Sequence, residues 1–99
     1  MIQAARLGND SIVKALVEKG KAATNSQNKR ERTALHLAAS QRHLSTVNIL
    51  LDKEADVDSL DDDGNSPLYI SCQDSQNLAV VQALLNAGAD VNILNRVSF

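Results

Sequence analysis

T-A-L-H-L-A-A, residues 33–39, recurs later in the chain as S-P-L-Y-I-S-C, residues 66–72. A partial copy, Ala4-Ala5, precedes Ala38-Ala39 at nearly the same spacing. Repeats with a period of roughly 20–50 residues are too small to bury their apolar faces alone and stack on their neighbours instead. The spacing therefore predicts a solenoid of about three repeats.

Both copies of this stretch have the features of a helix start. The hydroxyls of Thr33 and Ser66 can accept a hydrogen bond from an amide two or three residues further on, as an N-cap side chain does. Pro67 follows Ser66 at the first helical position, where its missing N–H leaves no hydrogen bond unmade. Apolar and small residues then repeat at helical spacing, as in Leu35 and Ala38-Ala39. We therefore expect a short, closely packed helix in each repeat.

A second helix is expected after each copy, because a second apolar block recurs at a constant offset. Spacing of i, i+3, i+4 within a block places its apolar residues on one helix face. We expect Ile12 and three columns to point inward: Val13, Val47 and Val81; Leu16, Leu50 and Leu84; Val17, Leu51 and Leu85. Arg42 stands in the place of Gly8 and Glu31 in the place of Gly64, so both are expected to adopt positive φ.

In these residues the chain resembles the ankyrin repeat family. Thr33–Ala38 matches the family signature T-P-L-H-x-A except at Ala34, and Ser66–Ser71 matches it less well. The segment Gly88–Asn92, G-A-D-V-N, is similar to the turn that ends a repeat of the family. The resemblance implies one all-α solenoid domain over residues 1–99, with helix-turn-helix repeats joined by β-turn fingers. The expected units are a partial repeat at 1–27, repeats at 28–60 and 61–94, and the start of a fourth at 95–99.

The composition is that of a folded chain, since 43% of its 99 residues are apolar. No run approaches the roughly 20 apolar residues of a membrane span, and residues 1–10 lack the apolar core of a signal peptide. Cys72 is the only cysteine, so no internal disulfide can form, and we expect its side chain in a small buried column. These features predict an intracellular protein, cytoplasmic or nuclear, without a membrane partner.

Charge divides the chain into two halves, although the net charge is only −2. Lysine and arginine outnumber acidic residues by nine to four in residues 1–53, whereas acidic residues outnumber basic ones by eight to one in residues 54–99. Lys29, Arg30 and Arg32 precede the second repeat and Asp61–Asp63 precede the third, so stacking should place these turns side by side. The acidic turn would repel phosphate, and 2% aromatic residues provide few stacking platforms, which argues against nucleic acid as a partner.

No set of residues indicates catalysis, a cofactor or a metal site. His36 and His43 are the only histidines and, with one cysteine, form no metal-ligand pattern; His36 is expected in the helix-capping network. Thr33 and Ser66 are needed as caps, which leaves no nucleophile with a neighbouring base. Asp61–Asp63 lack the ligand spacing of an EF-hand and are interpreted as a solvated turn, with a weak cation site as the alternative.

The function that these observations predict is non-catalytic recognition of a protein partner. The resemblance implies a concave binding surface made of the fingers and the exposed side of the first helices. Its expected members depart from the repeat pattern: Lys29, Arg30, Arg32, Ser40, Gln41, Asp62, Asp63, Asn65, Gln73 and Asp74. The alternative for these positions is that they are exposed and free to vary.

Three further hypotheses concern the chain as a whole. It could be a structural piece that spaces or caps the repeats of a longer array. Ankyrin-like repeats can be substrates of an asparaginyl hydroxylase, and Leu84 with Val91-Asn92 resembles the acceptor pattern, which makes Asn92 the modification candidate. Weak self-association is also expected, because apolar residues lie near both ends of the chain: Met1, Ile2, Ile93, Leu94 and Phe99.

Overall fold

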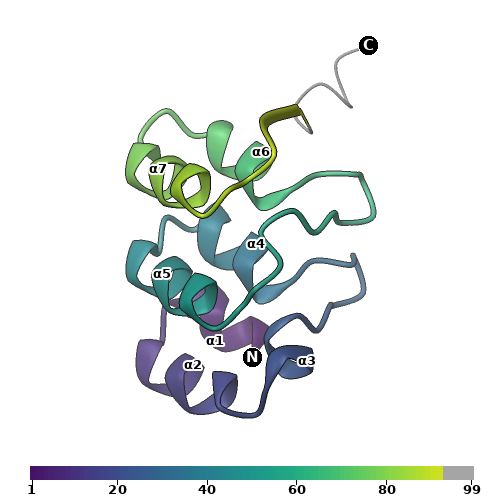
Figure 1. Ribbon diagram of the computed structural model, residues 1–99, viewed down its shortest axis with the longest axis vertical. Helices are drawn as coiled ribbons and strands as arrows, with labels where there is room; N and C mark the ends of the chain where they lie inside the picture. Colours follow the sequence, from purple (N-terminus) through teal and green to yellow (C-terminus); the bar gives the residue numbers. More distant parts are fainter. Residues whose placement is uncertain (93–99) are drawn as a thin grey trace.

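The computed structural model describes residues 1–92, which form three stacked pairs of helices (Figure 1). The helices are α1 (Ile2–Leu7), α2 (Asp10–Val17), α3 (Lys21–Thr24), α4 (Ala34–Ser40), α5 (Leu44–Asp52), α6 (Pro67–Cys72) and α7 (Leu78–Asn86). The inner helices α1, α4 and α6 stack on one another, as do the outer helices α2, α5 and α7. The described residues contain no strand, so the predicted all-α solenoid is confirmed. The expected start of a fourth repeat, residues 95–99, lies outside them.

The inner helices begin where the caps predict. The side-chain oxygen of Thr33 accepts a hydrogen bond from the His36 N–H at 3.4 Å, and that of Ser66 accepts one from the Tyr69 N–H at 3.1 Å. Pro67 is the first residue of α6. Thr33 and Ser66 are both buried, so these hydroxyls satisfy amides that water could not reach.

The core runs between the two layers of helices, and most of the predicted columns line it. Val13, Val47, Leu50 and Leu84 are all 0% exposed. Ile12 and Leu85 were expected to be buried as well, and this expectation is wrong, because their exposed fractions are 48% and 41%. Burial at these positions depends on whether the side chain faces the preceding or the following repeat.

Two series of equivalent residues explain the difference. In the series that begins at Ile12, Thr46 and Val80 are 0% and 2% exposed. Thr46 packs toward the preceding repeat, since its hydroxyl donates a hydrogen bond to the Asp10 carboxylate of α2 at 2.5 Å. In the third repeat Val80 is accordingly buried, whereas Val81, the expected counterpart of Val13 and Val47, is half-buried and packs against the core. No repeat precedes α2 within the described residues, so Ile12 stays exposed.

The opposite series faces the following repeat. Val17 is 5% exposed, Leu51 is half-buried and Leu85 is exposed. Cys72 follows the same rule: it is exposed, whereas Ala39, its counterpart in the preceding repeat, is 0% exposed. The expectation of a buried Cys72 is therefore wrong, because no described helix stacks on that side of α6.

Residues with positive φ stand at the predicted places in the helix–helix turns and in the fingers. Gly8 has φ 70° and its counterpart Arg42 has φ 61°, while Glu31 has φ 61° where Gly64 has φ 79°. Glu54, which is the counterpart in the second repeat of Gly20 and Gly88, also has a positive φ, of 66°. The third helix–helix connection, residues 73–77, is longer than the second, residues 41–43.

Side chains at the start of the outer helices bind the inner helix of the preceding repeat. The His43 Nε2 lies 3.0 Å from the Arg6 carbonyl oxygen, and the Asn77 amide donates to the Ala39 carbonyl at 2.8 Å. His43 and Asn77 are equivalent in the repeat, and the carbonyl groups they contact differ in register by one residue, since Arg6 corresponds to Ser40. The His43 ring lies so close to Gly8 that a Cβ there would be 2.8 Å from Nδ1. Gly8 is thus required both by its backbone conformation and by this contact.

The connection between α2 and α4 is more ordered than its polar sequence suggests. The polar residues 21–32 suggest an exposed finger, but α3 occupies the first four, and Thr24 is 1% exposed. The Thr24 hydroxyl donates to the Gly20 carbonyl at 3.2 Å. The longest helices of residues 1–92 have nine residues, and none is long and apolar enough to cross a membrane.

Candidate functional site

The second finger, residues 28–32 before α4, and the third finger, residues 61–65 before α6, are each built on one side chain that accepts hydrogen bonds from its own loop. The Oδ1 of Asn28 accepts from the Arg30 and Arg32 N–H groups at 2.9 and 3.0 Å. The Oδ1 of Asp61, at the equivalent place in the next repeat, accepts from the Asp63 and Asn65 N–H groups at 2.9 Å each. Asn and Asp favour such turns because their short side chains reach amides two residues on. The two fingers therefore have the same backbone geometry.

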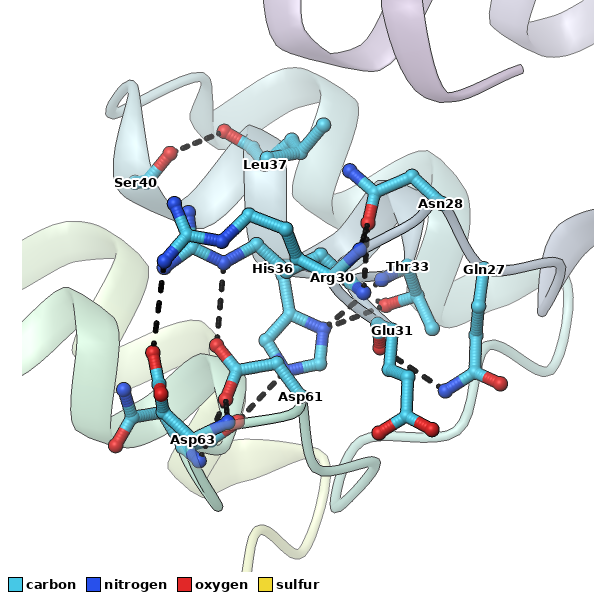
Figure 2. A network of polar contacts seen from close by, with 12 residues as sticks. Gln27, Asn28, Arg30, Glu31, Thr33, His36, Leu37, Ser40, Asp61 and Asp63 are labelled. Carbon is cyan, nitrogen blue, oxygen red and sulfur yellow. Dashed lines mark hydrogen bonds and ion pairs between the residues drawn. The ribbon is translucent and has the colours of Figure 1, made fainter.

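Arginine side chains join the second finger to the third (Figure 2). The Arg32 Nε donates to Asp61 Oδ2 at 3.1 Å, and the Arg30 guanidinium lies 3.6 Å from Asp63. The Asp62 N–H also donates to the Arg30 carbonyl at 2.9 Å. The predicted proximity of the basic and acidic turns is confirmed.

Asp61 is a structural residue and not part of a solvated turn as expected. It is 4% exposed, and both of its carboxylate oxygens accept hydrogen bonds. Burial alone would raise the pKa of Asp61, but the hydrogen bonds from the Asn65 N–H, Arg32 and the Asp63 N–H outweigh it and lower the pKa. One carboxylate oxygen from each of Asp61, Asp62 and Asp63 lies within 4.8 Å of those of the other two. Since Asp61 is fully engaged and Asp63 faces Arg30, this arrangement favours the finger structure over cation binding.

His36 connects the cap of α4 to the third finger. Its Nδ1 accepts a hydrogen bond from the Thr33 N–H at 3.1 Å and thereby completes a capping box, as predicted. The Nε2 donates to the Asn65 carbonyl at 2.8 Å, which assigns the proton of the neutral ring to Nε2. The ring is 0% exposed, and burial lowers the pKa of His36 below its usual 6.5.

A groove of about 550 Å³ lies on the side of α1 and α4 that faces the finger. It brings together four of the predicted contact residues, Arg30, Arg32, Ser40 and Gln41. The lining residues that were not predicted from the sequence are Ile2, Gln3, Arg6, Asn28 and Leu37. A signal for Arg6 was present, because it stands at the place in the first repeat that Ser40 occupies in the second.

The other predicted contact residues lie outside this groove. Lys29, Asp62 and Gln73 are exposed, and Asp63 is exposed beside Arg30. Two have structural partners: the Asn65 carbonyl accepts from His36, and the Asp74 carboxylate lies 3.1 Å from the Arg42 Nε.

Two further hollows lie between successive outer helices. One, of about 810 Å³ between α5 and α7, is lined by uncharged residues that include Leu44, Asn48, Leu78 and Gln82. Another lies between α2 and α5, and its lining includes Lys14, the counterpart of Asn48 and Gln82. Because these hollows occupy equivalent places, they are the furrows that any pair of stacked outer helices leaves. The groove on the inner side has a finger as an additional wall.

Comparisons with known proteins agree with this architecture. A family profile described as ankyrin repeats (3 copies) matches residues 1–95. The chain is 40% identical over 73 residues to alpha-latrocrustotoxin-Lt1a of Latrodectus tredecimguttatus, with 74% of this chain and 5% of the toxin covered. It is 39% identical over 87 residues to the nuclear factor NF-kappa-B p105 subunit of Gallus gallus, with 86% and 9% covered.

A plant relative is similar over a greater part of the chain. The chain is 34% identical over 92 residues to the probable E3 ubiquitin-protein ligase XBOS31 of Oryza sativa subsp. japonica, with 92% of this chain and 20% of the ligase covered. In each of these three relatives the chain spans a fifth of the length or less. The shared part is the repeat array, whose period, caps and stacked helix pairs are those described above. The chain belongs to the ankyrin repeat family.

Proposed function

We propose that this chain is a non-catalytic module that binds a protein partner on the concave face formed by the fingers and the inner helices. The groove between α1, α4 and the second finger carries the proposal, because it is lined by side chains outside the repeat pattern. The residues beside it are held by hydrogen bonds within the finger and between repeats. A preformed surface loses little conformational freedom on binding, so more of the contact free energy contributes to affinity.

The variety of relatives supports a recognition role. Their names describe a toxin, a nuclear factor subunit and a probable ubiquitin ligase, and the chain corresponds to 5–20% of each. What such different proteins share with this chain is an array of repeats and not one chemical activity. A binding module can be used in proteins of unrelated activity, because function resides in the site and not in the fold.

The test uses a partner recovered by affinity capture and measures its dissociation constant by calorimetry. The double variant Lys29→Glu/Arg30→Glu should weaken binding about tenfold or more, because both side chains are exposed in the second finger and Arg30 lines the groove. Arg32 stays unchanged because its Nε holds the buried Asp61 carboxylate. The matched control is Lys14→Glu/Lys19→Glu, which changes the net charge equally at exposed residues of α2 and the turn after it.

Equal loss of affinity in both double variants would mean that only net charge matters and that the concave face is not the site. If neither double variant affects any recovered partner, the alternative of a structural piece that spaces or caps an array gains support. Far-ultraviolet circular dichroism on each variant confirms that helicity is unchanged.

Asn92 is a second candidate site, for hydroxylation. Asn92 is exposed, so its side chain is accessible to an enzyme, and its backbone N–H donates to the Asp90 carboxylate at 2.9 Å. Incubation with an asparaginyl hydroxylase followed by mass spectrometry should detect one added oxygen atom on Asn92. An Asn92→Ala variant that gains the same oxygen would place the modification elsewhere.

A further inference from the structure

The groove between α1, α4 and the second finger has an unusual charge. Three of its nine lining residues are arginines, Arg6, Arg30 and Arg32, and none is acidic. The furrow between α5 and α7 has no charged lining residue, and the one between α2 and α5 has two lysines balanced by Glu18 and Asp52. Positive charge is therefore concentrated in this one of the three hollows.

These arginines retain much of their capacity to bind an anion. Arg6 is exposed and forms no ion pair with a described residue. Arg30 and Asp63 are 3.6 Å apart with side chains 61% and 60% exposed, and such exposed pairs contribute little free energy. Arg32 binds Asp61 through Nε, which fixes the side chain in place, and a guanidinium group has further N–H donors.

The remaining lining residues fit a peptide better than a small ion. Leu37 is 9% exposed and Ile2 is half-buried, so they provide an apolar floor between the charged groups. Gln3 and Gln41 add amide groups that can bind a peptide backbone. Arginine recognises carboxylates in a paired, directional geometry that lysine does not provide.

We propose, building on the proposed function, that this groove binds an acidic peptide segment of the protein partner. Carboxylates of the segment pair with Arg6 and Arg30, and Arg32 adds a third positive charge. An apolar side chain between those carboxylates lies on Leu37 and Ile2. Asp63 competes for Arg30 in the free protein, so removing the charge of Asp63 strengthens binding.

The experiment is a selection from a display library of random peptides of about twelve residues, long enough when extended to cross the groove. The intact 99-residue chain is the bait. We expect selected peptides to be enriched in Asp and Glu on both sides of an apolar residue. Synthetic peptides from the selection are then measured by fluorescence anisotropy.

Arg6→Glu should weaken binding of a selected peptide about tenfold or more, and Lys19→Glu, with the same charge change away from the groove, should weaken it far less. Asp63→Asn should tighten binding of the peptide, and higher salt should weaken binding because the charges are exposed.

Enrichment of neutral or basic peptides, equal effects of Arg6→Glu and Lys19→Glu, or an empty selection would overturn the proposal. Tighter Arg6-dependent binding of a single-stranded oligonucleotide than of any selected peptide would overturn it in favour of a phosphate ligand.

Different experimental outcomes would overturn the proposed function and this further inference. A captured partner that is sensitive to Lys29→Glu/Arg30→Glu but contains no acidic segment would leave the proposed function standing and overturn this inference. A partner insensitive to every variant in the groove and finger would overturn both.

Discussion

His36 contributes to two repeats through opposite sides of one ring. Its Nδ1 accepts from the Thr33 N–H and its Nε2 donates to the Asn65 carbonyl, and this pair of hydrogen bonds requires the neutral ring. Protonation would turn Nδ1 into a donor facing another donor in a buried site. The folded state therefore disfavours the charged ring, in agreement with the lowered pKa of His36.

This predicts a specific loss of stability in mild acid. The folded-state pKa of His36 lies below the unfolded value of about 6.5, so the unfolded chain binds the extra proton first. The contribution of His36 is complete above pH 6.5 and is lost as pH falls from there toward the folded pKa. Urea unfolding at a series of pH values from neutral into mild acid should show the decrease.

The variant His36→Gln serves as the control for that measurement. It is expected to be less stable at neutral pH, because a glutamine side chain does not reproduce both ring contacts, and to lose less stability in mild acid. An equally steep decrease in the variant would assign the pH dependence to other groups.

Leu50 tests the core at the scale of one side chain. It is 0% exposed, and Leu50→Ala should lower the free energy of unfolding by about 2–5 kcal/mol through lost burial and the cavity left behind. Leu78→Ala is the matched control, because Leu78 is 68% exposed, and its effect should stay within about 0.5 kcal/mol. Chemical denaturation measures both; similar losses would contradict the assigned helix faces.

At the scale of the helix pair, the turn between helices compares a glycine with an arginine at the same backbone position. Arg42 has φ 61°, which costs a residue with a Cβ about 1 kcal/mol. It also contacts two residues of the next connection, with Nε 3.1 Å from the Asp74 carboxylate and Nη1 2.8 Å from Gln76 Oε1. An exposed ion pair of this kind is worth about 0.2–1 kcal/mol, so the contacts roughly offset the backbone strain.

We therefore expect a definite order of stability in variants of Arg42. Arg42→Gly should equal or slightly exceed the parent in melting temperature, because it removes the strain along with the contacts. Arg42→Ala should be the least stable of the three, because it loses the contacts and keeps the strain. An Arg42→Gly variant that melts clearly lower than Arg42→Ala would contradict this account.

Gly8 should respond in the opposite way to its counterpart. Gly8→Ala introduces a Cβ at φ 70° and 2.8 Å from the His43 Nδ1, so the ring that binds the Arg6 carbonyl must move. The substitution should lower the free energy of unfolding by about 1–2 kcal/mol or more. Combining it with His43→Ala tests the contact: the cost of Gly8→Ala should shrink when the ring is absent.

At the scale of the whole molecule, the stack has the same hydrogen bonds at successive junctions. Asn25 Oδ1 accepts from the Asp56 N–H at 2.7 Å, and Asp58 Oδ1 accepts from the Asp90 N–H at 2.8 Å, at equivalent places in the loops. The basic second finger and acidic third finger meet at Arg32–Asp61 and Arg30–Asp63. The charge division seen in the sequence thus stabilises one junction and leaves excess positive charge in the groove beside it.

The first and third repeats each expose an apolar residue at a position that is buried or half-buried in the second repeat. Ile12 and Leu85 are 48% and 41% exposed, while their central counterparts Thr46 and Leu51 are buried and half-buried. We expect weak self-association of the 99-residue chain through these faces, detected by sedimentation equilibrium at several concentrations. The double variant Ile12→Glu/Leu85→Glu should sediment as a monomer. A parent chain that is strictly monomeric at high concentration would contradict the expectation. Ile93, Leu94 and Phe99, which were also expected to take part in self-association, lie outside the described residues.

The sequence alone determined the features that depend on residues near one another in the chain. The period, the Thr33 and Ser66 caps, the capping role of His36 and the left-handed Arg42 follow from local backbone chemistry. Columns in the middle of the stack, such as Val47 and Leu50, were predictable as well, because both neighbouring repeats are present there.

Only the tertiary structure decided what happens between repeats. The exposure of Ile12, Leu85 and Cys72 depends on whether another helix covers one side of their own, which local spacing does not encode. The sequence around Asp61 predicts a surface residue, but the fold buries it and places Arg32, from the preceding finger, against its carboxylate. The groove likewise requires Arg6, Arg30 and Arg32 to converge from α1 and the second finger. Burial and charge at a site are sums over neighbours in space, and those neighbours are set by how the repeats stack.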